Sequence, residues 1–199
     1  MSLESGKIKT SEKLYLEAEW QSQAQKMAKL FAKDLGLTKE QYLAYLPRFE
    51  PQPEQYKGRF DIPVIVETRI PLKRVIKEAD IYICLDPSSI IDWKKSGFTT
   101  GKQPYTAWLN DGRSNLGESV DAVRNSLKFD ERGGTVFEGI ALYLRNPRII
   151  DDHFLAFPGS QVFSIGVPYL SNWHGRIELA HRLVGSATSN CGSVIAGRK

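Results

Sequence analysis

The sequence predicts an α+β fold, with an N-terminal helical arm followed by a mostly antiparallel sheet on which two central helices pack. Three observations favour this class. Apolar residues recur at helical spacing in the first part of the chain, two central segments carry helix-capping residues, and the last third alternates short apolar runs with glycine and proline. The 199 residues are enough for one large domain or one domain with a small appendage.

The N-terminal arm is expected to contain two helices. Ser11 is a candidate N-cap residue, and the apolar residues that follow at spacings of three and four indicate a helix that ends near Gly36. Thr38 and Gln41 form a capping-box pair at the start of a second, short helix, and Pro47 ends it.

The segment after these helices has the composition of a linker. Residues 48–59 hold Pro51, Pro53 and a glycine among charged side chains. We therefore expect an arm at residues 1–47, a linker at 48–59 and an α+β core domain at 60–199, although the same pattern also fits one single domain.

The core is expected to begin with two strands. The runs PVIVE and IYICL are short and apolar, and PLKRVIKEA connects them as a helix or an irregular segment. A later run, TAWL, indicates another strand. Cys84, within IYICL, is expected to be buried in the core.

Two central helices come next. Asn115 and Glu118 form a capping pair ahead of the first, and Thr135 and Glu138 cap the second. Asn146 and the proline after it are expected to stop the second helix.

Strands are expected to make up most of the remainder. HFLAF and QVFSIGVPYL are apolar runs separated by turn residues, and a tail of small residues ends the chain. RIELAHRLV alternates like a strand but also fits a helix, and we favour the strand.

The segment VPYLSNWHGRIELAHRLVGSATSNCGSVIAGR, from Val167 onward, resembles the end of an uncharacterised bacterial domain family of unknown function. In that family, paired strands lead into a Gly-Ser-Ala-Ser/Thr turn with a nearby cysteine. The resemblance covers about the last third of the chain, from roughly Thr135. It implies a single compact fold, and because the family has no assigned activity, it supplies no functional residue.

The composition argues against several classes of protein. The net charge is only +4, and its 27 basic and 23 acidic residues are spread evenly, so we do not expect nucleic acid as a partner. The charge-free stretch 154–175 contains prolines and glycines, which favours strands over a membrane helix. Two cysteines and the lack of a secretory pattern at the N-terminus favour a cytoplasmic protein.

The leading functional hypothesis is a polar cleft that binds a small polar ligand or a protein partner. Its expected lining is Trp108, Asp111, Arg113, Asp130 and Arg132, since arginines beside carboxylates on a rigid scaffold can grip a polar molecule. The competing interpretation is that these residues only form a turn and solvated ion pairs. The N-terminal helices are the expected contact with a partner or with a second copy of the chain.

The alternative hypothesis is a small hydrolase or transferase. Its candidate catalytic residues are Cys191 as nucleophile with His174 or His181 as base, or else a pair of aspartates. The spacing of histidines and cysteines matches no metal-binding motif, so we expect neither a metal nor a cofactor. Whether the protein is an enzyme stays open at this stage.

Overall fold

The computed structural model describes the backbone of residues 3–198 and the side chains of residues 14–198, and it confirms the α+β class. Its helices are α1 Leu3–Phe31, α2 Lys39–Tyr45, α3 Leu72–Glu78, α4 Val120–Ser126, α5 Val136–Arg145 and α6 Ile149–Asp152. Short 3-10 helices lie at Lys33–Leu35, Glu54–Tyr56, Pro87–Ser89, Lys94–Ser96 and Arg113–Asn115. None of the helices within residues 3–198 is long and apolar enough to span a bilayer.

The strands form two sheets, and antiparallel pairing dominates both, as the sequence predicts. The small sheet has the order β1 Ile62–Val66, β4 Tyr105–Leu109, β11 Ile195–Gly197 and β5 Glu131–Gly133. The large sheet has the order β10 Cys191–Ser193, β6 Phe154–Ala156, β8 Gly166–Trp173, β7 Ser160–Val162 and β3 Ile90–Asp92. There β9 Arg176–Leu183 pairs with β8 and with β2 Tyr82–Ile83. The pairs β10–β6 and β2–β9 are parallel.

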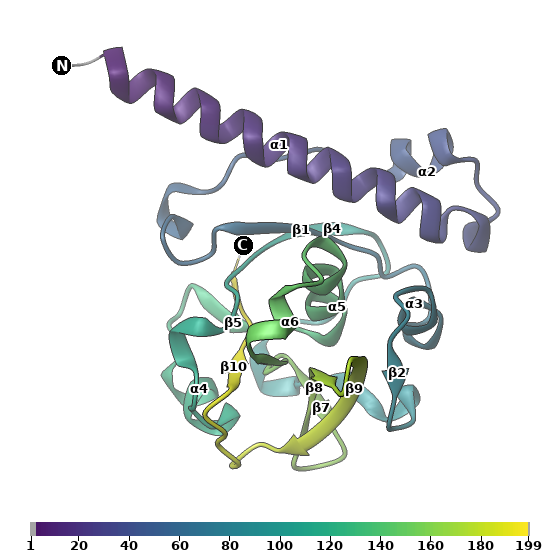
Figure 1. Cartoon of the computed structure of the whole chain (residues 1–199), viewed down its shortest axis with the longest axis vertical. Coiled ribbons are helices and arrows are strands. Elements are labelled where there is room, and N and C mark those ends of the chain that lie inside the picture. Colours follow the sequence, from purple (N-terminus) through teal and green to yellow (C-terminus); the bar gives the residue numbers. More distant parts are fainter. Residues whose placement is uncertain (1–2, 199) are drawn as a thin grey trace.

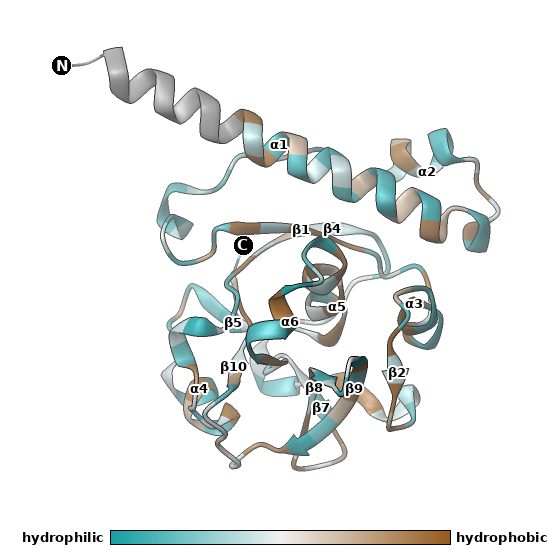
Figure 2. Cartoon of the chain, viewed as in Figure 1, coloured by the Kyte–Doolittle hydropathy of each residue, from teal (hydrophilic) through white to brown (hydrophobic). Residues whose placement is uncertain are grey.

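The elements stack in layers (Figure 1). Helix α1 runs across the outer side of β1 and β4, and α5 lies on the other side of these strands, where it contacts both β1 and β8. Along its described part, α1 alternates hydrophilic and hydrophobic residues (Figure 2). Trp20, Ala24, Met27 and Phe31 are buried against the sheet, which confirms the predicted amphipathic helix.

Polar contacts also join α1 to the core. The side-chain amide of Gln23 is buried, accepts a hydrogen bond from the Ile65 N–H at 3.0 Å and donates one to the Ala141 carbonyl at 3.2 Å. Lys26 Nζ donates to the Leu144 carbonyl at 2.6 Å, near the end of α5. Buried apolar residues of α1 belong to the same hydrophobic cluster as those of β1 and α5, so helix and core are packed as one unit.

Several local predictions are confirmed. Both capping boxes form, Thr38 with Gln41 ahead of α2 and Thr135 with Glu138 ahead of α5. Gly36 ends the 3-10 turn after α1 in a left-handed conformation, with φ of 67°. The ambiguous segment RIELAHRLV is strand β9.

Three local predictions are wrong. The backbone of α1 begins at Leu3, so the helix does not start at Ser11, whose side chain lies outside the described part. Asn115 and Glu118 do not cap α4, because Ser119 is its N-cap and accepts from the Ala122 N–H at 3.2 Å. Cys84 is exposed rather than buried, because β2 is a two-residue strand at the margin of the large sheet.

Asn115 has a different role from the one predicted. Its side-chain amide donates to the Ser193 carbonyl at 3.0 Å and accepts from the Ser193 N–H at 2.5 Å, which satisfies the outer edge of β10. Gly117, with φ of 83°, turns the chain between this contact and α4. Asn115 therefore closes a sheet edge instead of starting a helix.

Candidate functional site

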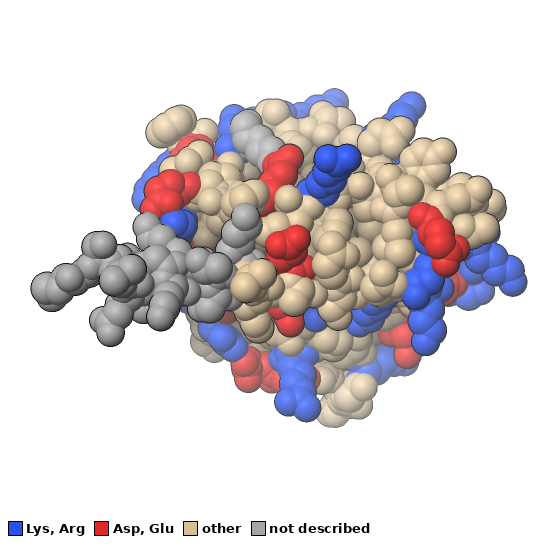
Figure 3. All heavy atoms as spheres, turned by 90° about the horizontal axis from the view of Figure 1, so that it is seen from above, with Lys and Arg blue, Asp and Glu red and all other residues tan. Residues whose placement is uncertain are grey.

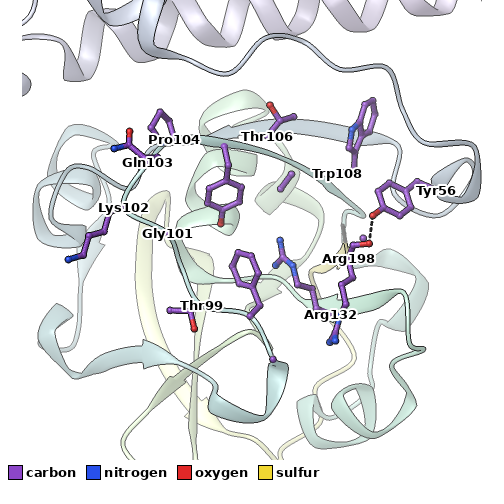
Figure 4. Close-up of a pocket in the computed structure, with 15 residues that line it drawn as sticks. Tyr56, Thr99, Gly101, Lys102, Gln103, Pro104, Thr106, Trp108, Arg132 and Arg198 are labelled. Atoms are coloured by element: carbon purple, nitrogen blue, oxygen red, sulfur yellow. Dashed lines mark hydrogen bonds between the residues drawn. The ribbon is translucent and has the colours of Figure 1, made fainter.

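A cavity of about 620 Å³ lies beside β4 and is called the β4 pocket here (Figure 4). Its walls come from the segment before the small sheet, the loop that precedes β4, β4 itself, β5 and the end of β11. The lining residues are Tyr56, Gly97, Phe98, Thr99, Gly101, Lys102, Gln103, Pro104, Tyr105, Thr106, Ala107, Trp108, Arg132, Gly197 and Arg198.

The pocket lies beside the part of β4, around Thr106, that pairs with no strand other than β1 within residues 3–198. Thr106 is opposite Ile65 in the β1–β4 pair, and the Ile65 N–H bonds to Gln23 instead of to β4. In antiparallel pairs, hydrogen-bonded and non-hydrogen-bonded positions alternate, so the Thr106 N–H and C=O point away from β1. On that other side, within residues 3–198, β11 contributes the single pairing Ala196↔Leu109, at the far end of β4.

The floor of the pocket holds a buried ion pair. Arg132 is 5% exposed, and both of its Nη atoms donate to the carboxylate of the fully buried Glu138, at 2.8 and 2.5 Å. Tyr105 Oη also donates to Glu138, at 3.1 Å. The Arg132 guanidinium lies 3.7 Å from the ring centroid of Phe98, so its flat face is stacked on an aromatic ring.

Burial and charge fix the protonation of this cluster. Burial alone disfavours the charged form of Arg132, but the attraction and hydrogen bonds of Glu138 outweigh it, and the pKa of Arg132 is raised. Burial, followed by the charge of Glu138, raises the pKa of Tyr105 well above its usual value. At neutral pH the floor therefore carries a charged arginine beside Glu138 and a neutral phenol.

The rim of the pocket is cationic. Lys102 and Arg198 are exposed there, and among the residues with described side chains neither forms a salt bridge with a carboxylate. Arg198 Nη2 donates to the Ser96 carbonyl at 2.8 Å, and Tyr56 Oη donates to the Arg198 carbonyl at 2.6 Å. These contacts hold Arg198 at the mouth without neutralising its charge.

The Thr106 hydroxyl is unsatisfied on the side of β4 that is turned toward α1 (Figure 4). The residue is only 5% exposed, and its hydroxyl has no hydrogen-bond partner in the described structure. A buried hydroxyl without a partner costs free energy, but this one points away from the side of β4 that carries Tyr105, so it marks no ligand position in the pocket.

The five residues predicted to line one cleft do not lie together. Trp108 and Arg132 line the β4 pocket. Asp111 lines a separate hollow of about 520 Å³ and lies 3.3 Å from Arg113, which also pairs with Asp152. Asp130 pairs at 2.9 Å with Arg59, a residue that lines the same hollow as Asp111. The carboxylates thus lie outside the pocket that contains Trp108 and Arg132.

Most of the pocket was not predicted from the sequence. Tyr56 lies in the expected linker, and Phe98 and Lys102 lie in the loop before β4. Arg198 lies in the tail of small residues near the end of the sequence. The one sequence signal for the loop was its glycine and lysine content, which is common in unremarkable loops.

Cys191 and the histidines do not form a catalytic arrangement. Cys191 is 3% exposed, and burial raises the pKa of its thiol, although nearby Arg182 opposes this. Successive residues of a strand face opposite sides, so His181 points away from the side on which Arg182 meets Cys191, and its ring lies against Phe163. His174 is in the β8–β9 turn, with φ of 52°. The structure therefore places neither histidine beside Cys191 to act as a base.

We predict that Cys84, and not Cys191, reacts with iodoacetamide in the folded protein. Desolvation, and then the charge of Glu178 and the contact from Cys84 Sγ to Glu178 Oε2 at 3.7 Å, raise the pKa of Cys84. Labelling should therefore be slow at pH 7 and accelerate above pH 9, because the thiolate is the reactive form. Mass spectrometry of the labelled protein measures both sites.

Two variants sharpen this test. Cys84→Ser should abolish labelling of the native protein, whereas Glu178→Gln should speed labelling of Cys84 at pH 7 because it removes the negative charge. Labelling of Cys191 before unfolding would contradict the burial described above.

Charge elsewhere is mixed. Figure 3 shows one face of the molecule, on which basic and acidic side chains alternate and form no continuous basic stripe. Among the residues whose side chains are described, no group of three or more histidine, cysteine, aspartate or glutamate side chains is arranged to hold a metal ion.

Comparisons of the chain with protein-family models, with curated proteins and with solved structures find no match. The likeness of the C-terminal segment to an uncharacterised bacterial family therefore stays a prediction. Function has to be inferred from the chemistry of the chain's own residues.

Proposed function

We propose that the protein is a binding protein for a small organic anion, and that the β4 pocket is its binding site. One observation carries this proposal: the pocket combines an aromatic floor with cations, and no aspartate or glutamate is among its lining residues. Pockets for small molecules are concave and mostly apolar, and a few polar groups fix the orientation of the ligand.

The cations have different roles. Arg132 is neutralised by Glu138, so it serves as a flat, fixed surface and not as a net positive charge. Lys102 and Arg198 keep their charge at the rim. An anionic group is therefore expected at the mouth of the pocket, with the apolar body of the ligand inside.

The floor suits an apolar and planar body. Phe98 and Tyr105 are partly exposed, and their rings meet edge to face at 5.9 Å. Trp108 and Tyr56 form the buried end of the pocket. Gly197 allows this arrangement because a Cβ at that position would run into the Tyr56 ring.

Binding is favoured over catalysis by the absence of reactive groups in the lining. No histidine, cysteine or carboxylate is among the lining residues, so the pocket lacks the usual general bases and the thiol nucleophile. The alternative of a thiol hydrolase has no geometric support either, because Cys191 is buried away from both histidines. A cytoplasmic location and the absence of a cofactor stay predictions from the sequence.

Phenyl phosphate tests the proposal because it joins a planar ring to an anion. We expect isothermal titration calorimetry to detect its binding, and the double variant Lys102→Ala/Arg198→Ala to bind it at least about tenfold more weakly, since each charge-assisted hydrogen bond contributes about 1.5–3 kcal/mol. The matched control is Lys39→Ala, an exposed lysine at the start of α2, which should leave the affinity unchanged. Equal affinity in the double variant, or no binding by the native protein, would contradict the proposal.

A further inference from the structure

We infer that the anion is a nucleoside phosphate whose base hydrogen-bonds to the free edge of β4 at Thr106. This inference rests on the proposed function and adds the class of ligand. It starts from the one part of the pocket wall that carries unsatisfied hydrogen-bonding groups in a fixed geometry.

Thr106 offers a donor and an acceptor side by side. Its N–H and C=O both point away from β1, since the N–H of the opposing residue, Ile65, bonds to Gln23. Each nucleobase presents a donor beside an acceptor on its Watson–Crick edge, and proteins recognise exposed bases through that edge.

The length of the free edge favours a base over a peptide strand. On one side of Thr106, Pro104 has no N–H to donate. On the other side, β11 already pairs with β4 at Leu109. Within residues 3–198 this edge is open around Thr106 and closed by β11 next to Trp108, which leaves room for the two-point contact of a base and is too short to add a β-strand.

The rest of the pocket fits the remaining parts of a nucleotide. Phe98, Tyr105 and the stacked guanidinium of Arg132 supply flat surfaces of the kind on which bases stack. Lys102 and Arg198, at the rim, can hold a phosphate. A volume of about 620 Å³ falls within the range of pockets that hold small ligands.

The test compares nucleotides with ligands that lack a base. AMP, GMP, CMP and UMP are titrated by calorimetry beside ribose 5-phosphate and phenyl phosphate. We expect at least one nucleotide to bind about tenfold or more tightly than ribose 5-phosphate, as one or two further hydrogen bonds and base stacking would give. Methylation of the Watson–Crick edge of that nucleotide, as in N6,N6-dimethyl-AMP for AMP, should remove the gain.

Two variants of Thr106 separate its groups. Thr106→Val removes a hydroxyl that points toward α1, so it should leave the binding of nucleotides and of ribose 5-phosphate unchanged. Thr106→Pro removes an N–H that β1 does not use, so the protein should fold and lose the gain from the base. If the proline variant does not fold, the methylated nucleotide decides the question.

The outcomes distinguish the two proposals. If phenyl phosphate binds at the rim cations but no nucleotide exceeds ribose 5-phosphate, or if methylation of the base has no effect, this inference is overturned and the anion-binding function stands. If none of these anions binds, both are overturned.

Discussion

Replacement of Glu138 by alanine is expected to lower the free energy of unfolding by about 3–5 kcal/mol, the usual cost of leaving one partner of a buried ion pair uncompensated. Glu138 is fully buried and accepts both Nη donors of Arg132, as well as the Thr135 N–H at 2.7 Å. Its loss therefore strands a buried guanidinium and removes half of the capping box of α5. Urea unfolding followed by circular dichroism measures the change.

Two comparisons isolate the cause. The sequence pattern predicts that Glu118 caps a helix, but in the structure Ser119 is the N-cap of α4. Glu118→Ala should therefore change the unfolding free energy by less than about 0.5 kcal/mol. The double variant Arg132→Met/Glu138→Leu removes both charges together and should be more stable than Glu138→Ala alone. A loss of less than about 1 kcal/mol in Glu138→Ala would show that the pair is not buried as described.

Replacement of Gln23 by leucine is the second large effect, with an expected loss of about 2–4 kcal/mol, because each buried group left without a partner costs about 1–3 kcal/mol. The Ile65 N–H and the Ala141 carbonyl would both lose their hydrogen bond in this variant. Leucine has a similar size, so the apolar packing of α1 on the sheet would be largely kept. The same urea titration measures the loss.

The matched control is Gln25→Leu, an exposed position on the same helix, which should stay within about 0.5 kcal/mol of the native protein. If Gln23→Leu were equally neutral, α1 would not be fastened to β1 and α5 through this amide. The variant also bears on the β4 pocket. The Ile65 N–H donates to Gln23 and therefore points away from β4, so the N–H and C=O of the opposing Thr106 point away from β1.

Elements specified by neighbouring residues were predictable from the sequence. Both capping boxes depend on residues three positions apart, and both form as predicted. The cap assigned to Asn115 failed because a distant backbone, at Ser193, competes for the same amide. An asparagine in a capping pattern does not reveal which of two partners it will bind.

The candidate site was predictable only in part for the same reason. Trp108 and Arg132 were identified from the sequence, but the free edge of β4 follows from how β1 and β11 pair with it. The sequence also does not show that Arg132 lines the pocket while its neighbour Glu131 pairs with Arg59 outside it. Adjacent strand residues face opposite sides of a sheet, so basic and acidic residues that are neighbours in the sequence are separated in the structure. The basic ones in the pocket and the ion pairs outside it therefore lie at different places.

The indole N–H signals of the protein test the anion-binding pocket most directly. The chain has four tryptophans, Trp20, Trp93, Trp108 and Trp173, and only Trp108 lines the β4 pocket. Titration of the ¹⁵N-labelled protein with phenyl phosphate should shift the Trp108 indole signal, assigned with Trp108→Phe, and leave that of the exposed Trp173 in place. The shift should disappear in Lys102→Ala/Arg198→Ala. An unchanged Trp108 signal, with shifts at Trp173 or Trp93 instead, would contradict the account.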